Sequence, residues 1–393
     1  MADSRHQLAF LDGLRGYASL WVLIGHVMFM TGYTVEILAQ PDMAVELFII
    51  ISGFLMTYHY QAREAREPWM EPDTWKVFWI RRFFRIAPLY YVCLAVALWF
   101  GTELWQARLD TASVLHGGIE EQARYANRYL DTSLSNILLH VSFLFGMTWT
   151  HNFQTPLPDW SIGLEMQYYA IFPLLMIIAL KLGRVAGMAL LVGVMAVAGT
   201  WLDHNGFVVG AYSMLPMKFH LFAAGMLMAM TLRVEGKWKW LLIAGALAVI
   251  FVPLGGGRSA LHRGIKIGIV LGFLALLYKD RLPALLKWPT GILDWFFSNP
   301  LSRWLGDLSY GVYLVHLIVI MPVCGWLALS YPAMQPMPRF FTALGLTILI
   351  TYAIAYLCYR VIEQPGISLG RKIASRYQNK AAAPKAVPSE NPA

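Results

Sequence analysis

The sequence predicts an all-helical, polytopic membrane protein with about ten transmembrane helices. Of the 393 residues, 58% are hydrophobic and only 14% are charged, whereas a soluble chain has about 25% charged residues. The mean hydropathy is +0.53. Apolar runs close to the length that spans a bilayer as a helix, about 20 residues, recur along the chain. A protein surface with so few charged residues would not be soluble, which excludes the soluble globular classes.

Ten apolar runs are long enough to be predicted as spans, and an eleventh stretch is ambiguous. The stretch 134–150 is shorter and contains His140. It is either an eleventh span or a segment that lies at the interface or enters the membrane and returns. The ten predicted spans are 8–32, 43–61, 86–103, 158–180, 185–202, 212–232, 238–255, 264–279, 306–330 and 339–361.

The charges of the loops distinguish the two layouts, because cytoplasmic loops carry an excess of Lys and Arg. With ten spans and the N-terminus inside, most basic residues fall in inner segments. An eleventh crossing would invert every segment after residue 150 and remove this asymmetry. We therefore predict ten spans, a non-crossing 134–150 segment and two cytoplasmic termini. The predicted outer segments hold only Arg108, Arg124, Arg128, Arg258, Arg263 and Arg339.

The net charge, the cysteine spacing and the C-terminal composition limit the possible partners and the domain organisation. The formal net charge is +8, but the basic residues lie between apolar runs, so no nucleic-acid partner is expected. Cys93, Cys324 and Cys358 lie in apolar stretches without a CxxC spacing, which supports neither a disulfide framework nor a zinc site. We predict one membrane domain, 1–370, followed by a basic and then Pro- and Ala-rich tail, 371–393, which is expected to be disordered.

Ionisable side chains inside the spans are the main functional signal, because each costs at least a few kcal/mol in a bilayer. Arg15 and His26 of the first span share one helix face and lie about 16 Å apart along its axis. Arg15 alone can snorkel and His26 alone can be a packing residue. Glu46, near the outer end of the second span, is predicted at the depth of His26. A carboxylate there would fix the imidazole tautomer, as a catalytic base needs.

Further polar residues extend this set. Arg81 and Arg85 share a helix face, with Arg82 beside them. They form either a basic cluster that only sets the orientation in the membrane or a phosphate-binding rim. The second reading is possible because a guanidinium group can bind two phosphate oxygens at once. Other candidates for a polar interior, open to water or ligand, are Ser52, Glu165, Tyr313 and His316.

Five of these segments, in this order, resemble the signatures of the membrane-bound acyltransferase-3 family, the polytopic O-acyltransferases that modify bacterial polysaccharides. The resemblance runs from about residue 8 to residue 365. Ile49 departs from the second Phe usual in the second segment, and Tyr168 replaces the Phe usual in the fourth. The five segments are LDGLRGYASLWVLIGH (11–26), ELFIIISGFL (46–55), RRFFRIAPLYY (81–91), WSIGLEMQYY (160–169) and LGDLSYGVYLVHL (305–317).

The resemblance implies an O-acetyltransferase of the bacterial inner membrane. Its donor would be cytoplasmic acyl-CoA, usually acetyl-CoA. Its acceptor would be a hydroxyl of an extracytoplasmic saccharide, lipid-linked or free, such as exopolysaccharide or lipopolysaccharide O-antigen. A thioester is already activated, so no metal is expected. The CoA phosphates are expected at Arg15, Arg81, Arg82 and Arg85.

The reaction implied by the resemblance needs a base for the sugar hydroxyl. We expect His26, held by Glu46, to act as this general base or to carry the acyl group transiently. The main alternative is a transporter or flippase for a glycan or lipid-linked saccharide. Intramembrane His, Glu and Arg suit a proton-coupled carrier as well.

Overall fold

The computed structural model describes residues 8–115, 125–205, 212–254 and 259–381, which contain helices and turns and no strand. Eight helices in these ranges are long and apolar enough to cross a membrane, which confirms an all-helical polytopic membrane protein. They are α3 (Pro41–Arg63), α4 (Pro72–Trp99), α9 (Trp160–Lys181), α10 (Arg184–His204), α11 (Leu215–Met230, extended by the turn η3, Thr231–Arg233), α13 (Ala260–Leu277), α15 (Pro300–Ser330) and α16 (Pro336–Cys358), which continues into α17.

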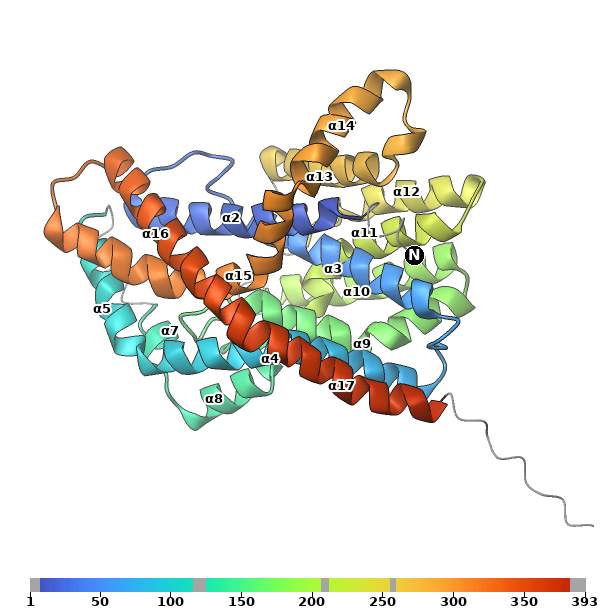
Figure 1. The fold of residues 1–393 in the computed structure, drawn as a ribbon, viewed down its shortest axis with the longest axis horizontal. Helices are drawn as coiled ribbons and strands as arrows, with labels where there is room; N and C mark the ends of the chain where they lie inside the picture. The colour runs from blue at the N-terminus through green and yellow to red at the C-terminus, as the bar shows by residue number, and fades with distance from the viewer. Residues whose placement is uncertain (1–7, 116–124, 206–211, 255–258, 382–393) are drawn as a thin grey trace, which may run out of the picture.

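Two of the ten predicted spans are not among these eight helices. α2 (Phe10–Thr31) has 22 residues and is long enough to cross at about 1.5 Å per residue, but it carries Asp12, Arg15 and His26. α12 (Lys237–Val249) has only 13 residues. In Figure 1, α2, α4 and α9 run along the long axis of the molecule, so α2 lies within the bundle of long helices.

The connection between α4 and α9 is built from short helices. α5 (Gly101–Ala112) is followed, after residues outside the described ranges, by α7 (Asn127–Leu130), α8 (Leu134–Val141) and the 3-10 helix η2 (Leu144–Met147). α8 has 8 residues, a length of about 12 Å, against a hydrocarbon core of about 30 Å. The ambiguous stretch 134–150 therefore does not cross the membrane as one helix.

Glycines allow the central helices to approach closely, as small residues do in other membrane proteins. A Cβ at Gly53 of α3 would stand 2.2 Å from the backbone oxygen of Phe222 in α11, and one at Gly225 would stand 2.1 Å from that of Ile50. Gly306 of α15 packs in the same way on the backbone of Asp12 in α2. These contacts set the spacing of the helices that carry the polar residues.

A turn and a further helix connect α13 to α15, whose N-terminus is capped. After α13, the turn η4 (Lys279–Arg281) leads into α14 (Ala284–Ser298), which extends away from the bundle at the top of Figure 1. Asn299 then caps α15, because its side-chain oxygen accepts the N–H of Ser302 at 2.9 Å.

The C-terminal part of the chain is helical beyond the predicted domain boundary. A π-helical turn, η5 (Tyr359–Glu363), joins α16 to α17 (Gln364–Ala381), and α17 lies along α4 (Figure 1). The tail predicted to start at residue 371 must therefore be corrected, because α17 continues to Ala381. An amphipathic helix packed on α4 does not need the long apolar run that the sequence prediction looked for. Residues 382–393 of that tail lie outside the described residues.

Candidate active site

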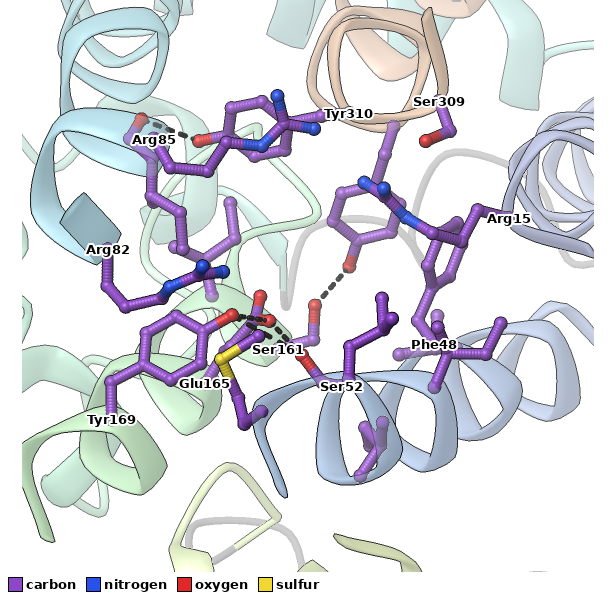
Figure 2. A pocket seen from close by; sticks show the side chains of 18 of the residues that line it. Arg15, Phe48, Ser52, Arg82, Arg85, Ser161, Glu165, Tyr169, Ser309 and Tyr310 are labelled. Atoms are coloured by element: carbon purple, nitrogen blue, oxygen red, sulfur yellow. Dashed lines mark hydrogen bonds between the residues drawn. The ribbon is translucent and has the colours of Figure 1, made fainter. Parts of the chain in front are cut away.

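A cavity lies between α2, α3, α4, α9 and α15 and encloses about 880 Å³ free of protein atoms, part of it open to solvent. Figure 2 shows Arg15 and Arg82 reaching into it from opposite sides, with Glu165 and Ser52 between them. The rest of its wall is largely apolar. The structure brings together here six residues singled out from the sequence: Arg15, Ser52, Arg82, Arg85, Glu165 and Tyr313.

The arginines predicted as a phosphate rim differ in their partners. Arg85 is 2.8 Å from the Glu363 carboxylate, and Arg81, which does not line this cavity, is 2.9 Å from Glu67. Within the described part of the chain, Arg15 and Arg82 form no ion pair. Arg82 lies over the ring of Tyr169, 5.8 Å from the centroid.

Glu165 places a carboxylate between Arg15 and Arg82. It accepts hydrogen bonds from the hydroxyls of Ser52 on α3 and Tyr169 on α9, as Figure 2 shows. Tyr169 is four residues after Glu165, so the two share one face of α9. The sequence prediction passed over Tyr169, although its spacing from Glu165 was a usable signal.

Tyr313 lies between the cavity and a pair of histidines. Its hydroxyl donates to the backbone oxygen of Pro158 at 2.5 Å and lies 2.7 Å from the hydroxyl of Ser161. Its ring centroid is 6.0 Å from that of His316, and the same ring lines the cavity. Ser161 also lines the cavity and was missed in the sequence, because serines are common in helices and carry no distinctive spacing.

His26 and His316 face each other with ring centroids 5.0 Å apart. The Nδ1 atom of His26 is 2.8 Å from the backbone oxygen of Val22, and that of His316 is 2.7 Å from the backbone oxygen of Tyr313. A carbonyl oxygen only accepts, so in each neutral ring Nδ1 carries the proton and Nε2 carries the lone pair. His316 is fully buried, and its Nε2 has no hydrogen-bond partner among the described residues.

The structure places Glu46 away from His26, which corrects the predicted carboxylate–imidazole contact. Glu46 is 2.8 Å from the ammonium of Lys218 and 3.0 Å from that of Lys266. All three side chains are buried. Helix depth alone suggested the contact with His26, but the rotation of α3 turns Glu46 toward α11 and α13.

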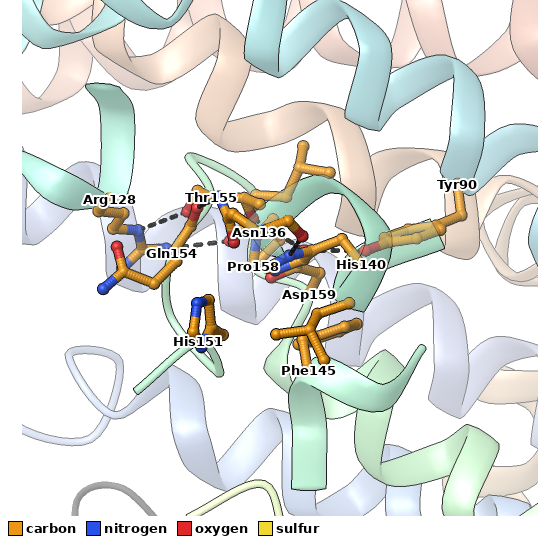
Figure 3. A network of polar contacts seen from close by, with 12 residues as sticks. Tyr90, Arg128, Asn136, His140, Phe145, His151, Gln154, Thr155, Pro158 and Asp159 are labelled. Atoms are coloured by element: carbon orange, nitrogen blue, oxygen red, sulfur yellow. Dashed lines mark hydrogen bonds and ion pairs between the residues drawn. The ribbon is translucent and has the colours of Figure 1, made fainter. Parts of the chain in front are cut away.

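A second polar network holds the loop that precedes α9 (Figure 3). Asp159 accepts hydrogen bonds from Thr155 at 2.8 Å and Tyr90 at 3.2 Å, and His140 lies 3.7 Å away. Burial raises the pKa of Asp159 above its ordinary value, against the lowering effect of His140. Arg128 donates to the backbone oxygens of Thr155 and Leu157.

This network supports the wall next to the histidines, because the same loop supplies the backbone oxygen that Tyr313 binds. Neither Asp159 nor Arg128 was predicted as a site residue. Asp159 directly precedes the WSIGLEMQYY segment and could have been included with it. Arg128 was counted only as an outer-loop charge.

Comparison with known proteins gives one family and several distant relatives. The acyltransferase domain family (Acyl_transf_3) matches residues 8–356. The peptidoglycan O-acetyltransferase OatA of Listeria monocytogenes is 26% identical over 382 residues, covering 92% of this chain and 56% of OatA. The acyltransferase MdmB of Streptomyces mycarofaciens is 29% identical over 176 residues, covering 43% of this chain and 39% of MdmB.

The chain thus spans about half the length of relatives such as OatA. No solved structure matches it.

Proposed function

The chain belongs to the acyltransferase domain family, and from this premise we propose that it is a membrane-bound O-acetyltransferase. It takes the acetyl group from acetyl-CoA on the cytoplasmic side and transfers it to a hydroxyl of an extracytoplasmic saccharide. The observation that carries this proposal is the cavity itself. Arg15 and Arg82, which form no ion pair among the described residues, face it, and Tyr313 links its wall to the His26–His316 pair.

The phosphates of CoA bind at the arginines in this proposal. Arg15 and Arg82 are half-buried and form no ion pair in the described part of the chain, and a partly desolvated guanidinium without such a pair is costly. A phosphate ligand supplies the missing charge and can bind a guanidinium through two hydrogen bonds. Arg85 is already paired with Glu363, so its charge is largely balanced and it binds the phosphates less directly. The pantetheine arm extends from this end of the cavity toward His26.

The arginines also orient the protein. Because Lys and Arg concentrate on the cytoplasmic side of a membrane protein, the end of the bundle that carries Arg63, Arg81 and Arg82 faces the cytoplasm. His26 then lies toward the opposite side, in the inner membrane of a bacterium, where a saccharide acceptor reaches it. Both termini are cytoplasmic in this layout.

His26 activates the acceptor through Nε2, because its Nδ1 proton is held by Val22. Nε2 takes the hydroxyl proton as the acceptor oxygen bonds to the thioester carbonyl carbon. The C–S bond then breaks, and the CoA sulfur takes the proton from His26. In the two-step form of the proposal, Nε2 itself bonds to the carbonyl carbon and the C–S bond breaks, so CoA leaves as the thiolate and an acyl-imidazolium remains. The acceptor oxygen then bonds to the acyl carbon, the C–N bond to Nε2 breaks, and the hydroxyl proton passes to the CoA thiolate.

The acceptor we propose is a cell-surface saccharide, such as an exopolysaccharide repeat unit, lipopolysaccharide O-antigen or peptidoglycan. OatA, similar to this chain over 92% of its length, is a peptidoglycan O-acetyltransferase, which supports this class. The saccharide meets the site as a polymer or as a lipid-linked precursor.

Incubating membranes that contain the protein with radiolabelled acetyl-CoA and these saccharides tests the proposal. We expect label on the saccharide with the wild type and none with His26→Ala, whose folding is checked by size-exclusion chromatography. Accumulation of unmodified saccharide in vesicles would instead identify a carrier. Near-normal acetylation by His26→Ala would overturn the assigned role of His26.

A further inference from the structure

A second, smaller cavity adjoins the first at the end of α3 and the start of α4. Its lining bounds about 350 Å³ free of protein atoms, part of it open to solvent, and it shares Met56 and Arg82 with the larger cavity. Its polar lining includes Arg63, Arg81 and His59. None of these three residues takes part in the transfer step described above. The ligand of this cavity is therefore still to be assigned.

The charges around the smaller cavity are unbalanced. Arg63, Arg81 and Arg82 line it, and Glu67 is the one carboxylate among its lining residues. Arg81 is held by Glu67, which also accepts a hydrogen bond from Gln378 of α17 at 2.5 Å. Within the described residues, Arg63 has neither an ion pair nor a hydrogen bond from its guanidinium. The local excess of about two positive charges matches a phosphate monoester, which carries −1.5 to −2 at pH 7.

We propose that the smaller cavity binds the 3′-phosphate of the adenosine part of the donor, with Arg63 as its principal ligand. This inference rests on the proposed function and names which part of the donor lies where. The diphosphate of the donor then lies at Arg15 and Arg82 in the larger cavity.

Arg63 differs in environment from its neighbour Arg66. The Arg63 side chain lines the cavity, whereas Arg66, three residues later, is exposed and lines neither cavity. Both carry the same charge at the same end of the bundle. Arg66→Gln is therefore a matched control that removes one charge without touching the cavity.

The test measures binding of two nucleotides to the full chain in phosphatidylcholine nanodiscs by isothermal titration. Adenosine 3′,5′-bisphosphate has the 3′-phosphate, and adenosine 5′-monophosphate lacks it. We expect the bisphosphate to bind about tenfold more tightly or better. Arg63→Gln should remove this preference while still binding the monophosphate, which shows that the variant is folded. Arg66→Gln should retain it.

Equal affinity for the two nucleotides, or an unchanged preference in Arg63→Gln, would overturn the inference. Adding phosphatidate to the nanodiscs distinguishes the other source of a phosphate monoester, a lipid headgroup. We expect no weakening of bisphosphate binding, and strong competition would assign the cavity to the lipid instead.

Acetyl transfer from acetyl-CoA and from acetyl-3′-dephospho-CoA separates this inference from the proposed function. If neither donor supports acetyl transfer, the proposed function is contradicted. The preference for the bisphosphate over the monophosphate can still be measured in that case. Equal KM values for the two donors contradict only the 3′-phosphate site.

Discussion

His26 and His316 show how the backbone sets the chemistry of single side chains. Each ring donates its Nδ1 proton to a carbonyl oxygen within its own helix, so each presents an unprotonated Nε2. In contrast, the protons of Ser52 and Tyr313 are committed to Glu165 and to the backbone of Pro158. The histidines, and not these hydroxyls, are the groups free to accept a proton at this site.

Arg15 tests the phosphate role at the scale of one residue. Arg15→Lys keeps the positive charge but loses the guanidinium fork. We expect the Kd for acetyl-CoA to rise about tenfold, corresponding to the loss of one charged hydrogen bond. Arg303→Lys, an exposed position in the first turn of α15, should leave this Kd unchanged. An unchanged Kd in Arg15→Lys would make Arg15 a determinant of topology alone.

Glu46 is predicted to stabilise the fold. Glu46→Gln leaves the buried ammonium groups of Lys218 and Lys266 without their counter-charge. We expect the free energy of unfolding to fall by about 3 kcal/mol or more, measured as a lower Tm in detergent. Glu36→Gln, at an exposed position, is the control. A normal Tm together with lost transfer would instead assign Glu46 to catalysis.

At the scale of elements, glycine contacts bring α3 and α11 close enough to bury the polar residues between neighbouring helices. Gly53 and Gly225 each face a backbone oxygen of the partner helix at a distance that leaves no room for a Cβ. Ser52 precedes Gly53 and faces the cavity. The packing of α3 on α11 therefore also fixes the position of the Ser52 hydroxyl relative to Glu165.

Gly53→Ala is expected to lower the Tm and to cost about 1–3 kcal/mol of stability, because its Cβ would meet the Phe222 backbone oxygen of α11 at 2.2 Å. The matched control is Gly268→Ala in α13, where nothing lies within 4 Å of the added Cβ. That change should be neutral or slightly stabilising, because Ala is a better helix former than Gly. Equal Tm values for the two variants would contradict the packing described here.

The sequence predicted which segments form helices better than it predicted which residues contact each other. Long apolar runs locate spans because the bilayer requires them, which is why α3, α9 and α15 were predicted close to their observed ranges. The helical continuation α17 lacks that signal, and the run 238–255 has it although α12 ends at Val249. An apolar run also says nothing about how a helix is rotated.

Helix rotation and pairing between residues far apart in the chain explain where the observed site differs from the predicted one. Glu46 faces Lys218, 172 residues away in the chain, and no local pattern predicts that pair. Arg85 meets Glu363 for the same reason. By contrast, Arg15, Ser52 and Glu165 belong to motifs whose helices converge on one cavity.

At the scale of the whole molecule, the arrangement separates two kinds of chemistry along the bundle. Arg15, Arg82 and the smaller cavity offer positive charge at one end. His26 and His316 offer basic nitrogens further along, beyond Tyr313. Under the proposed function, a donor that reaches from one to the other joins a cytoplasmic phosphate site to an acceptor on the opposite side of the membrane.

Transfer across a sealed membrane tests this central claim most directly. The protein is reconstituted in liposomes, radiolabelled acetyl-CoA is supplied on the side of the arginines, and the saccharide acceptor is supplied on the other side. We predict labelled saccharide with the wild type and none with His26→Ala. Labelling that occurs only when donor and acceptor share one side, or that persists in His26→Ala, would contradict the account.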